Sequence, residues 1–326
     1  MPRTRIAVLV AVSAAALIGA SPAASSPTLT AGDPPYDVAR PTLAAALECP
    51  TRFVHPNHEP VLLVHGTGLT AAESWSWNYS KLLPGAGFDA CAVTLPHRSM
   101  TDIQTSAEYV AYAVAVMAYR AGRRVAVITH SQGGMEARWA IRWWASARSN
   151  VADLVLLASP NHGITAADAC AGSGNCWPAV WQMATAAHFL HALNSVDETP
   201  GAVAITNLYS RTDELVEPSS TVPLSGDHVA NIAVQDICPR PVHHAGMLHD
   251  PTVYAAVIDA LTHSGPADAG RIPSSTCLQP FAPGLTAADV AAGNVMLYDD
   301  AATQGFAPAP GSAREPTLRA YAARYG

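Results

Sequence analysis

Short apolar runs alternate with longer amphipathic segments along most of the chain. Each apolar run ends at glycine, proline or polar residues, so we predict buried strands that are followed by turns. The predicted strands are residues 61–64, 88–95, 125–129, 151–158, 203–208 and 229–237. The predicted helices are residues 108–120, 135–148, 178–193, 251–261 and 287–298, with Thr286 as a candidate cap of the last. This alternation predicts an α/β fold with a mostly parallel central sheet flanked by helices.

The regular pattern breaks after Pro160. Residues 161–178 carry Gly, Asp, Asn and two cysteines, and long irregular segments in compact domains are often lids or binding loops. We therefore predict a cap or lid insertion over about residues 161–200. Otherwise residues 27–326 are predicted to form a single α/β domain, with a C-terminal extension over about residues 265–326.

The N-terminus has the pattern of a secretory signal peptide, which we assign to residues 1–26. A basic start with Arg3 and Arg5 precedes an apolar, Ala-rich run over residues 6–20, and small residues follow. That run is short for a membrane span, although an N-terminal anchor is the alternative. We expect a secreted, extracellular protein, with the cleavage position left open.

The composition allows a large core and argues against nucleic-acid binding. The chain has 326 residues, of which 49% are hydrophobic and 13% charged. Lys and Arg number 18 against 25 acidic residues, and they are scattered. The net charge of −7 therefore offers no basic surface for nucleic acid.

Export makes disulfide bonds the expected state of the cysteines. The six cysteines are Cys49, Cys91, Cys170, Cys176, Cys238 and Cys277. Six cysteines allow fifteen pairings, and the sequence alone does not choose between them. Local order favours 49–91, 170–176 and 238–277. Their spacing fits no zinc-finger pattern.

One serine stands where a predicted strand gives way to a predicted helix. The stretch THSQG at 129–133 resembles the nucleophile motif G-x-S-x-G, with Thr129 in the first position. A sharp turn there would present the hydroxyl of Ser131, and Gly133 and Gly134 would relieve backbone clashes. Ser131 is the candidate nucleophile, and a serine that merely caps a helix is the alternative.

A glycine-rich loop, HGTG at 65–68, follows the predicted strand 61–64. A second donor loop is expected at this place in such folds. The backbone amides of Thr67 and Gln132 are therefore candidates for an oxyanion hole, and an ordinary glycine turn is the alternative.

An acid and a base follow the later strands in the order that a Ser–Asp–His triad requires. Asp213 and Glu214 compete for the acid, and His243 and His244 compete for the base. Each of these residues alone is more often a surface or core side chain.

A metal site is a further possibility, since His243, His244, His249 and Asp250 cluster in the sequence. Adjacent histidines rarely face one ion, so an ordinary loop is favoured and no metal or cofactor is expected.

These motifs together resemble the α/β-hydrolase lipases typified by lipase B of Candida antarctica and its bacterial homologues. The resemblance runs from about residue 40 to the end. The matching stretches are GTG at 66–68, THSQGG at 129–134, TNLYSRTDELVEP at 206–218, HAG at 244–246 and EPTLRAYA at 315–322.

The resemblance implies an α/β-hydrolase fold and a serine carboxylic-ester hydrolase, of the triacylglycerol lipase or carboxylesterase type. It implies Ser131 as nucleophile, Asp213 over Glu214 as acid, and His244 over His243 as base. An acyl-enzyme intermediate and no cofactor follow from the same likeness. The expected partner is a small-molecule or lipid ester. We also expect transient contact with a lipid interface and a monomeric enzyme.

The resemblance also assigns further residues. Thr67, through its amide and hydroxyl, and Gln132 correspond to the oxyanion donors. The pairs Cys49–Cys91 and Cys238–Cys277 match two family disulfides. A third is missing, because Arg314 occupies one of its positions.

Departures from the family fall in the substrate pocket and the lid. His130 replaces a tryptophan, and Asn161 and Met183 replace polar pocket residues. The extra pair Cys170–Cys176 lies where the family has a small mobile lid helix. We therefore expect hydrolysis of soluble esters without a sharp rate increase at an oil–water interface.

Two other functions remain open from the sequence. An acyltransferase would use the same acyl-enzyme and pass the acyl group to an alcohol. A binding protein on a hydrolase scaffold would have lost activity, although all the candidate catalytic positions are filled.

Overall fold

The computed structural model describes residues 32–217, 222–298 and 311–326. The predicted signal peptide therefore lies outside the described residues. Within the described ranges, no helix combines the length and apolarity that crossing a bilayer requires.

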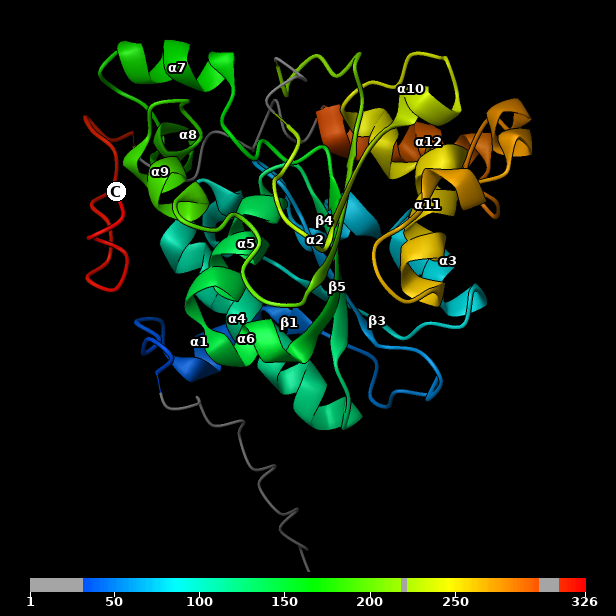
Figure 1. Ribbon diagram of the computed structural model, residues 1–326, viewed down its shortest axis with the longest axis horizontal. Helices are drawn as coiled ribbons and strands as arrows, with labels where there is room; N and C mark the ends of the chain where they lie inside the picture. The colour runs from blue at the N-terminus through cyan, green and yellow to red at the C-terminus, as the bar shows by residue number, and fades with distance from the viewer. Residues whose placement is uncertain (1–31, 218–221, 299–310) are drawn as a thin grey trace, which may run out of the picture.

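The centre of the protein is a seven-stranded sheet with the strand order β1-β3-β2-β4-β5-β6-β7 (Figure 1). The strands are β1 Leu47–Glu48, β2 Val61–Val64, β3 Ala90–Val93, β4 Val125–His130, β5 Val151–Leu157, β6 Ala204–Tyr209 and β7 Val229–Ala233. All neighbouring pairs are parallel except β1 with β3. The predicted parallel sheet is confirmed, and the short antiparallel strand β1 was not predicted.

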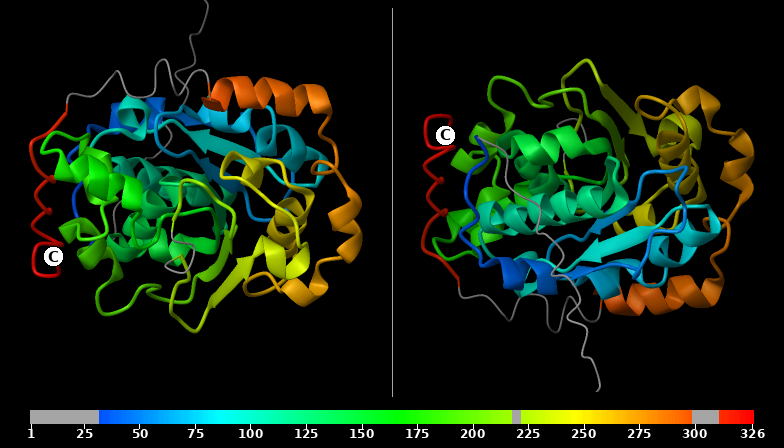
Figure 2. Two further views of the ribbon diagram at one scale, coloured as in Figure 1. Left: turned by 90° about the horizontal axis from the view of Figure 1, so that it is seen from above. Right: turned by 90° about the horizontal axis from the view of Figure 1, so that it is seen from below.

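Helices cover both faces of the sheet (Figures 1 and 2). The helices of the described ranges are α1 Arg40–Ala45, α2 Ala71–Trp75, α3 Tyr79–Gly85, η1 Pro96–Ser99, α4 Ile103–Ala121, α5 Gly133–Trp143, α6 Ala145–Asn150, α7 Thr165–Gly172, α8 Pro178–Gln182, α9 His188–Asn194, α10 Val234–Ile237, η3 Ala245–Leu248, α11 Pro251–Thr262, η4 Ala269–Arg271, η5 Ser274–Leu278 and α12 Ala287–Asn294.

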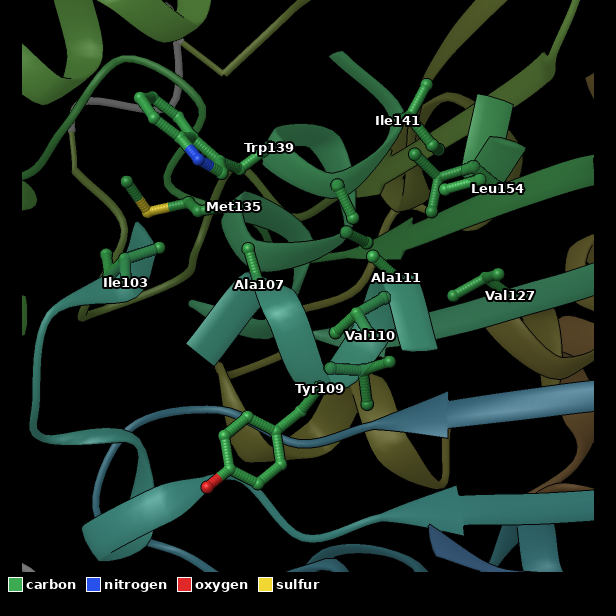
Figure 3. Close-up of a cluster of buried hydrophobic side chains, with 14 of the residues drawn as sticks. Ile103, Ala107, Tyr109, Val110, Ala111, Val127, Met135, Trp139, Ile141 and Leu154 are labelled. Atoms are coloured by element: carbon green, nitrogen blue, oxygen red, sulfur yellow. The ribbon is translucent and has the colours of Figure 1, made fainter. Parts of the chain in front are cut away.

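Successive strand residues supply two separate cores, because side chains alternate between the faces of a strand. On β2, Leu62 and Val64 pack with α4, α5 and α6, and Figure 3 shows part of this cluster. Val61 and Leu63 pack on the opposite face with α2, α3 and α11. Burial on both faces explains why the strands read as continuous apolar runs.

Of the two last predicted elements, the strand was wrong at its end and the helix was not. The predicted strand 229–237 stops at Ala233, because its partner β6 ends at Tyr209, which pairs with Ala233. The next residues form the helical turn α10 instead, in which the Cys238 amide donates to the carbonyl of Val234 at 2.9 Å. The predicted helix 287–298 is confirmed, because α12 begins with Thr286 and Asp289 in a capping box, and residues 295–298 continue it beyond Asn294 as a π-helical turn.

Two predicted helices are each split. Trp144 divides residues 135–148 into α5 and α6, because its backbone is extended and its buried indole donates to the carbonyl of Pro34. Residues 178–193 divide into α8 and α9. A turn intervenes, in which the amide and hydroxyl of Thr185 donate hydrogen bonds to Asp168 of α7.

Three disulfides, Cys49–Cys91, Cys170–Cys176 and Cys238–Cys277, confirm the pairings that local order favoured. The residues between β5 and β6, where the cap was predicted, carry the short helices α7, α8 and α9. The C-terminal segment 311–326 lies beside α8 and α9 (Figure 2).

Candidate active site

Ser131 occupies a strained turn between β4 and α5. Its φ is 55°, in the left-handed region, which costs a non-glycine residue about 1–3 kcal/mol. The Ser131 amide donates to the carbonyl of Leu157 at 2.8 Å, and its own carbonyl accepts from the Gly134 amide at 3.1 Å. Among the described residues, its hydroxyl has no hydrogen-bond partner. The turn therefore holds a partly exposed hydroxyl at the end of β4.

The loop after β2 lies directly against this turn. A Cβ atom at Gly133 would stand 2.5 Å from the carbonyl oxygen of His65, and one at Gly66 would stand 2.9 Å from Ser131 Cβ. Both positions therefore require glycine. The close approach brings Thr67 beside Gln132, and the Thr67 hydroxyl donates to Gln132 Oε1 at 2.5 Å.

Two backbone N–H groups, those of Thr67 and Gln132, are available as hydrogen-bond donors where these loops meet. Within the described ranges, neither the Thr67 nor the Gln132 backbone N–H donates a hydrogen bond to another group. Gln132 is the residue that precedes α5, where helix N–H groups lack intrahelical acceptors and favour negative charge. The two residues that the sequence proposed as oxyanion donors are thus brought together.

A buried acid–base pair comes from the loops after β6 and β7. His244 Nδ1 lies 2.8 Å from Asp213 Oδ2, and the two side chains are 7% and 2% exposed. The other oxygen, Oδ1, accepts from the amides of Leu215 and Val216. Burial opposes ionisation of Asp213, but the hydrogen bonds from His244 and the two amides outweigh it and lower the pKa of this carboxyl group. The site holds a carboxylate behind the imidazole.

The competing residues form a different pair. His243 and Glu214 lie 3.3 Å apart, with side chains 69% and 43% exposed. Glu214 accepts a hydrogen bond from the backbone amide of His244 at 3.0 Å. Glu214 thus contacts the loop that carries His244, whereas Asp213 contacts the imidazole itself.

His130 lies against the imidazole of His244. The two ring centroids are 4.7 Å apart, and His130 Nε2 lies 3.2 Å from the carbonyl oxygen of His244. Burial, with a smaller contribution from His244, lowers the pKa of His130 to about 3, so its ring is neutral. Because His130 precedes Ser131 in the chain, this contact brings the loop of His244 to the serine turn.

The other two predicted pocket residues are buried. Asn161 donates from Nδ2 to Asn207 Oδ1 and to the carbonyl of Val222. Met183 is 4% exposed and belongs to the core beside α5. Their predicted role in a pocket remains a prediction.

Sequence reasoning missed two residues that support the site. His65 accepts from the Leu95 amide at Nε2 and donates from Nδ1 to the Gly66 carbonyl, and burial lowers its pKa to about 4. A neutral imidazole therefore fixes the start of the glycine loop. Its place as the first residue of HGTG was the available signal. The second residue is Glu136, a carboxyl group within an otherwise apolar helix start.

The predicted histidine cluster is dispersed in space. The His249 ring packs near Trp77 and Phe281, with ring centroids 6.1 Å and 5.8 Å away. Asp250 caps α11 by accepting from the amides of Thr252 and Val253. In the part of the chain that the structure describes, no group of three or more His, Cys, Asp or Glu side chains is placed to hold a metal ion.

The mostly parallel sheet, the serine turn between strand and helix, and the Asp–His pair from later strand ends define an α/β-hydrolase. Comparison with known proteins then gives the family. Residues 58–252 match the family described as Lipase (class 2).

Individual relatives extend this match over most of the chain. Lipase B of Pseudozyma antarctica is 31% identical over 301 residues, which cover 89% of this chain and 86% of that protein. The crystal structure of Aspergillus fumigatus lipase B superposes with a TM-score of 0.84 at 30% identity, covering 92% of this chain and 75% of that one. The chain belongs to the class 2 lipase family and is a carboxylic-ester hydrolase of the lipase and esterase type, as the resemblance implied.

Proposed function

We propose that the protein is a secreted serine hydrolase that cleaves small-molecule or lipid esters through Ser131, His244 and Asp213. The observation that carries this proposal is the buried Asp213–His244 hydrogen bond beside a serine held at positive φ. A serine hydroxyl is a weak nucleophile unless a neighbouring base takes its proton, and that base needs an orienting acid.

In the first half of the reaction, Ser131 Oγ attacks the ester carbonyl carbon while His244 takes the hydroxyl proton at Nε2. Because Asp213 accepts from Nδ1, Nε2 is left free as the base. Asp213 also stabilises the imidazolium that forms, which is consistent with the lowered pKa of its carboxyl group. His244 then protonates the leaving alcohol, and the acyl group stays on Ser131.

In the second half, water attacks the acyl-enzyme and His244 again acts as base and then as acid. The product is the carboxylic acid, and the free enzyme returns. In both halves the carbonyl oxygen becomes negatively charged. The unoccupied N–H groups of Thr67 and Gln132 are the proposed donors to this oxyanion.

Secretion is part of the same proposal. All six cysteines are paired, and disulfides persist in oxidising compartments. The predicted signal peptide, residues 1–26, is consistent with that compartment. Sequencing the N-terminus of protein recovered from the culture medium tests this point, and we expect it to begin after residue 20.

The proposed chemistry is tested by replacing the nucleophile. Ser131→Ala should fold normally, because the change removes only a hydroxyl that has no partner in the described structure. Hydrolysis of p-nitrophenyl esters should fall by at least about 10⁴-fold, by comparison with other serine hydrolases. Full activity in a correctly folded Ser131→Ala variant would refute the assignment.

A further inference from the structure

A buried carboxyl group lies behind the proposed oxyanion hole. Glu136, in the first turn of α5, is 0% exposed. Its Oε1 accepts from Gln132 Nε2 at 2.7 Å and from Ser99 Oγ at 2.9 Å. Its Oε2 is buried and has no hydrogen-bond partner among the described residues. A half-satisfied buried carboxyl group costs stability, so packing alone does not explain a glutamate here.

The contacts of Gln132 fix the orientation of its side-chain amide. Its Nε2 lies 2.8 Å from the backbone carbonyl oxygen of Ser99, which can only accept, and 2.7 Å from Glu136 Oε1. The nitrogen must therefore point toward Ser99 and Glu136. Gln132 Oε1 points the other way and accepts the hydroxyl proton of Thr67.

This chain of hydrogen bonds ties together the two loops that carry the proposed oxyanion donors. Thr67 belongs to the loop after β2, and Gln132 belongs to the turn after β4. Oxyanion donors are effective only within a narrow range of distance from the developing charge. A small shift of one loop against the other would therefore weaken both N–H contacts.

We propose that Glu136 is a positioning residue of the oxyanion hole. It holds the Gln132 side chain and, through it, Thr67, so that the two backbone N–H groups converge on one oxygen. This role presupposes the ester hydrolysis by Ser131 that is proposed above.

The protonation state of Glu136 predicts that the rate should also depend on pH. Burial raises its pKa to about 8, against the opposing effect of the hydrogen bonds from Gln132 and Ser99. Near neutral pH the carboxyl group is therefore mostly uncharged. Above pH 8 it would place a negative charge close to the oxygen on which negative charge develops, which would disfavour the transition state.

Other titratable groups on adjoining elements do not account for this shift. The adjoining elements are β2, η1, α4, β4, α5 and β5. Their titratable groups, with those of the flanking residues, include His65, His97, Arg98, Asp102, Glu108, Arg120, His130, Arg138, Arg142 and Asp153. None of them is among the causes of the shift in the pKa of Glu136. Arg98 is engaged with Glu73, and His65 is neutral.

The test uses Glu136→Leu, Glu136→Gln and a matched control. Leucine removes the acceptor for Gln132, whereas glutamine keeps an acceptor oxygen without the acid. The control is Glu108→Leu on α4, because Glu108 is also a buried glutamate but accepts from the Val38 amide, away from these loops. Each variant is first checked for folding by thermal unfolding.

We expect Glu136→Leu to lower kcat for p-nitrophenyl butyrate about tenfold or more, with KM little changed. An alkylboronic acid, which forms a tetrahedral adduct with serine, should bind more weakly by a similar factor. Glu136→Gln should recover most of the loss and should keep its kcat above pH 8, where the kcat of the wild type falls. Glu108→Leu should leave kcat and boronate affinity unchanged.

Unchanged kcat and boronate affinity in folded Glu136→Leu would overturn the proposal. If that variant does not fold, the pH profile decides, and an identical alkaline decline in Glu136→Gln and wild type would overturn it. Failure of the underlying reaction is distinguishable, because it would appear as full activity in Ser131→Ala.

Discussion

The turn after β4 and the segment after β5 follow neighbouring strands, but different kinds of contact hold them. The turn that carries Ser131 is fixed by backbone contact, since Gly133 lies directly against the carbonyl of His65. The segment that carries α7 is held by separate local ties. These ties are the Cys170–Cys176 disulfide, the Asp168–Thr185 contact and the backbone pairing of Cys176 with Ser312.

This difference predicts which property a substitution in each region should change. In the first region the backbones of two loops are in direct contact, so a change that separates the loops should impair both geometry and chemistry. In the second region one tie can be removed while the others remain. We expect changes there to alter stability and access to the site rather than the chemical step.

The largest expected effect is on the acid of the proposed triad. Asp213→Asn should lower kcat by about 10⁴-fold, because an amide cannot hold His244 in the required tautomer. Glu214→Gln is the matched control, since Glu214 is next to Asp213 in the chain and contacts the His243 side chain and the backbone amide of His244 rather than the His244 imidazole. Its kcat should fall less than about tenfold, and equal losses in the two variants would contradict the assignment of the acid. Both are measured with p-nitrophenyl butyrate at neutral pH.

A pair of glycine substitutions compares the two regions directly. Gly133→Ala should lower the free energy of unfolding by about 3 kcal/mol or prevent folding, because its Cβ atom would overlap the carbonyl of His65. Gly172→Ala, in α7, should change it by no more than about 1 kcal/mol in the stabilising direction, since a Cβ atom there meets no atom within 4 Å. Chemical denaturation measures both. Equal destabilisation would show that the two regions do not differ as described.

Removing the disulfide of the α7 segment should affect stability and access. The double variant Cys170→Ser/Cys176→Ser should lose about 2 kcal/mol of unfolding free energy, as expected for a short closed loop. Its kcat on a soluble ester should stay near the wild-type value.

We propose that this segment is a lid restrained by the disulfide. Activity on tributyrin above its solubility limit should then rise more steeply in the variant than in the wild type. A steep rise already present in the wild type with intact disulfides would contradict this.

The last expected effect is a pH dependence of stability. The pKa of Glu136 is about 8 in the folded protein, against an ordinary value of 4.5. Between these values the folded state binds more protons than the unfolded state, so the free energy of unfolding should fall as pH rises from 4.5 to 8.

The variant Glu136→Gln should lack this contribution, so its stability relative to the wild type should increase with pH across that range. Glu108→Gln should show the same sign over a narrower range, because burial raises the pKa of Glu108 only to about 6. Denaturation at pH 5 and pH 8 measures both. A pH-independent difference between Glu136→Gln and wild type would contradict the raised pKa of Glu136.

Much of the parallel sheet could be predicted, because strands buried on both faces leave continuous apolar runs in the sequence. The end of β7 could not, since it depends on where its partner β6 stops. The break at Trp144 also depends on a distant contact, with Pro34. Such features are set by tertiary packing rather than by local pattern.

The site shows the same division. Ser131 and the loop of Thr67 could be found because each follows a strand and stands beside glycine. The choice of His244 over His243 from residues alone stayed open, because adjacent histidines have equal local patterns. Glu136 could not be found, since only the fold brings Gln132 and Ser99 to the same carboxyl group.

The most direct test of the central claim is covalent labelling with a fluorophosphonate, which reacts only with an activated serine. Peptide mapping by mass spectrometry should locate a single adduct on Ser131, and labelling should be much slower in Asp213→Asn. An adduct on another residue, or no adduct on an enzyme that hydrolyses esters, would contradict a nucleophile at the turn after β4.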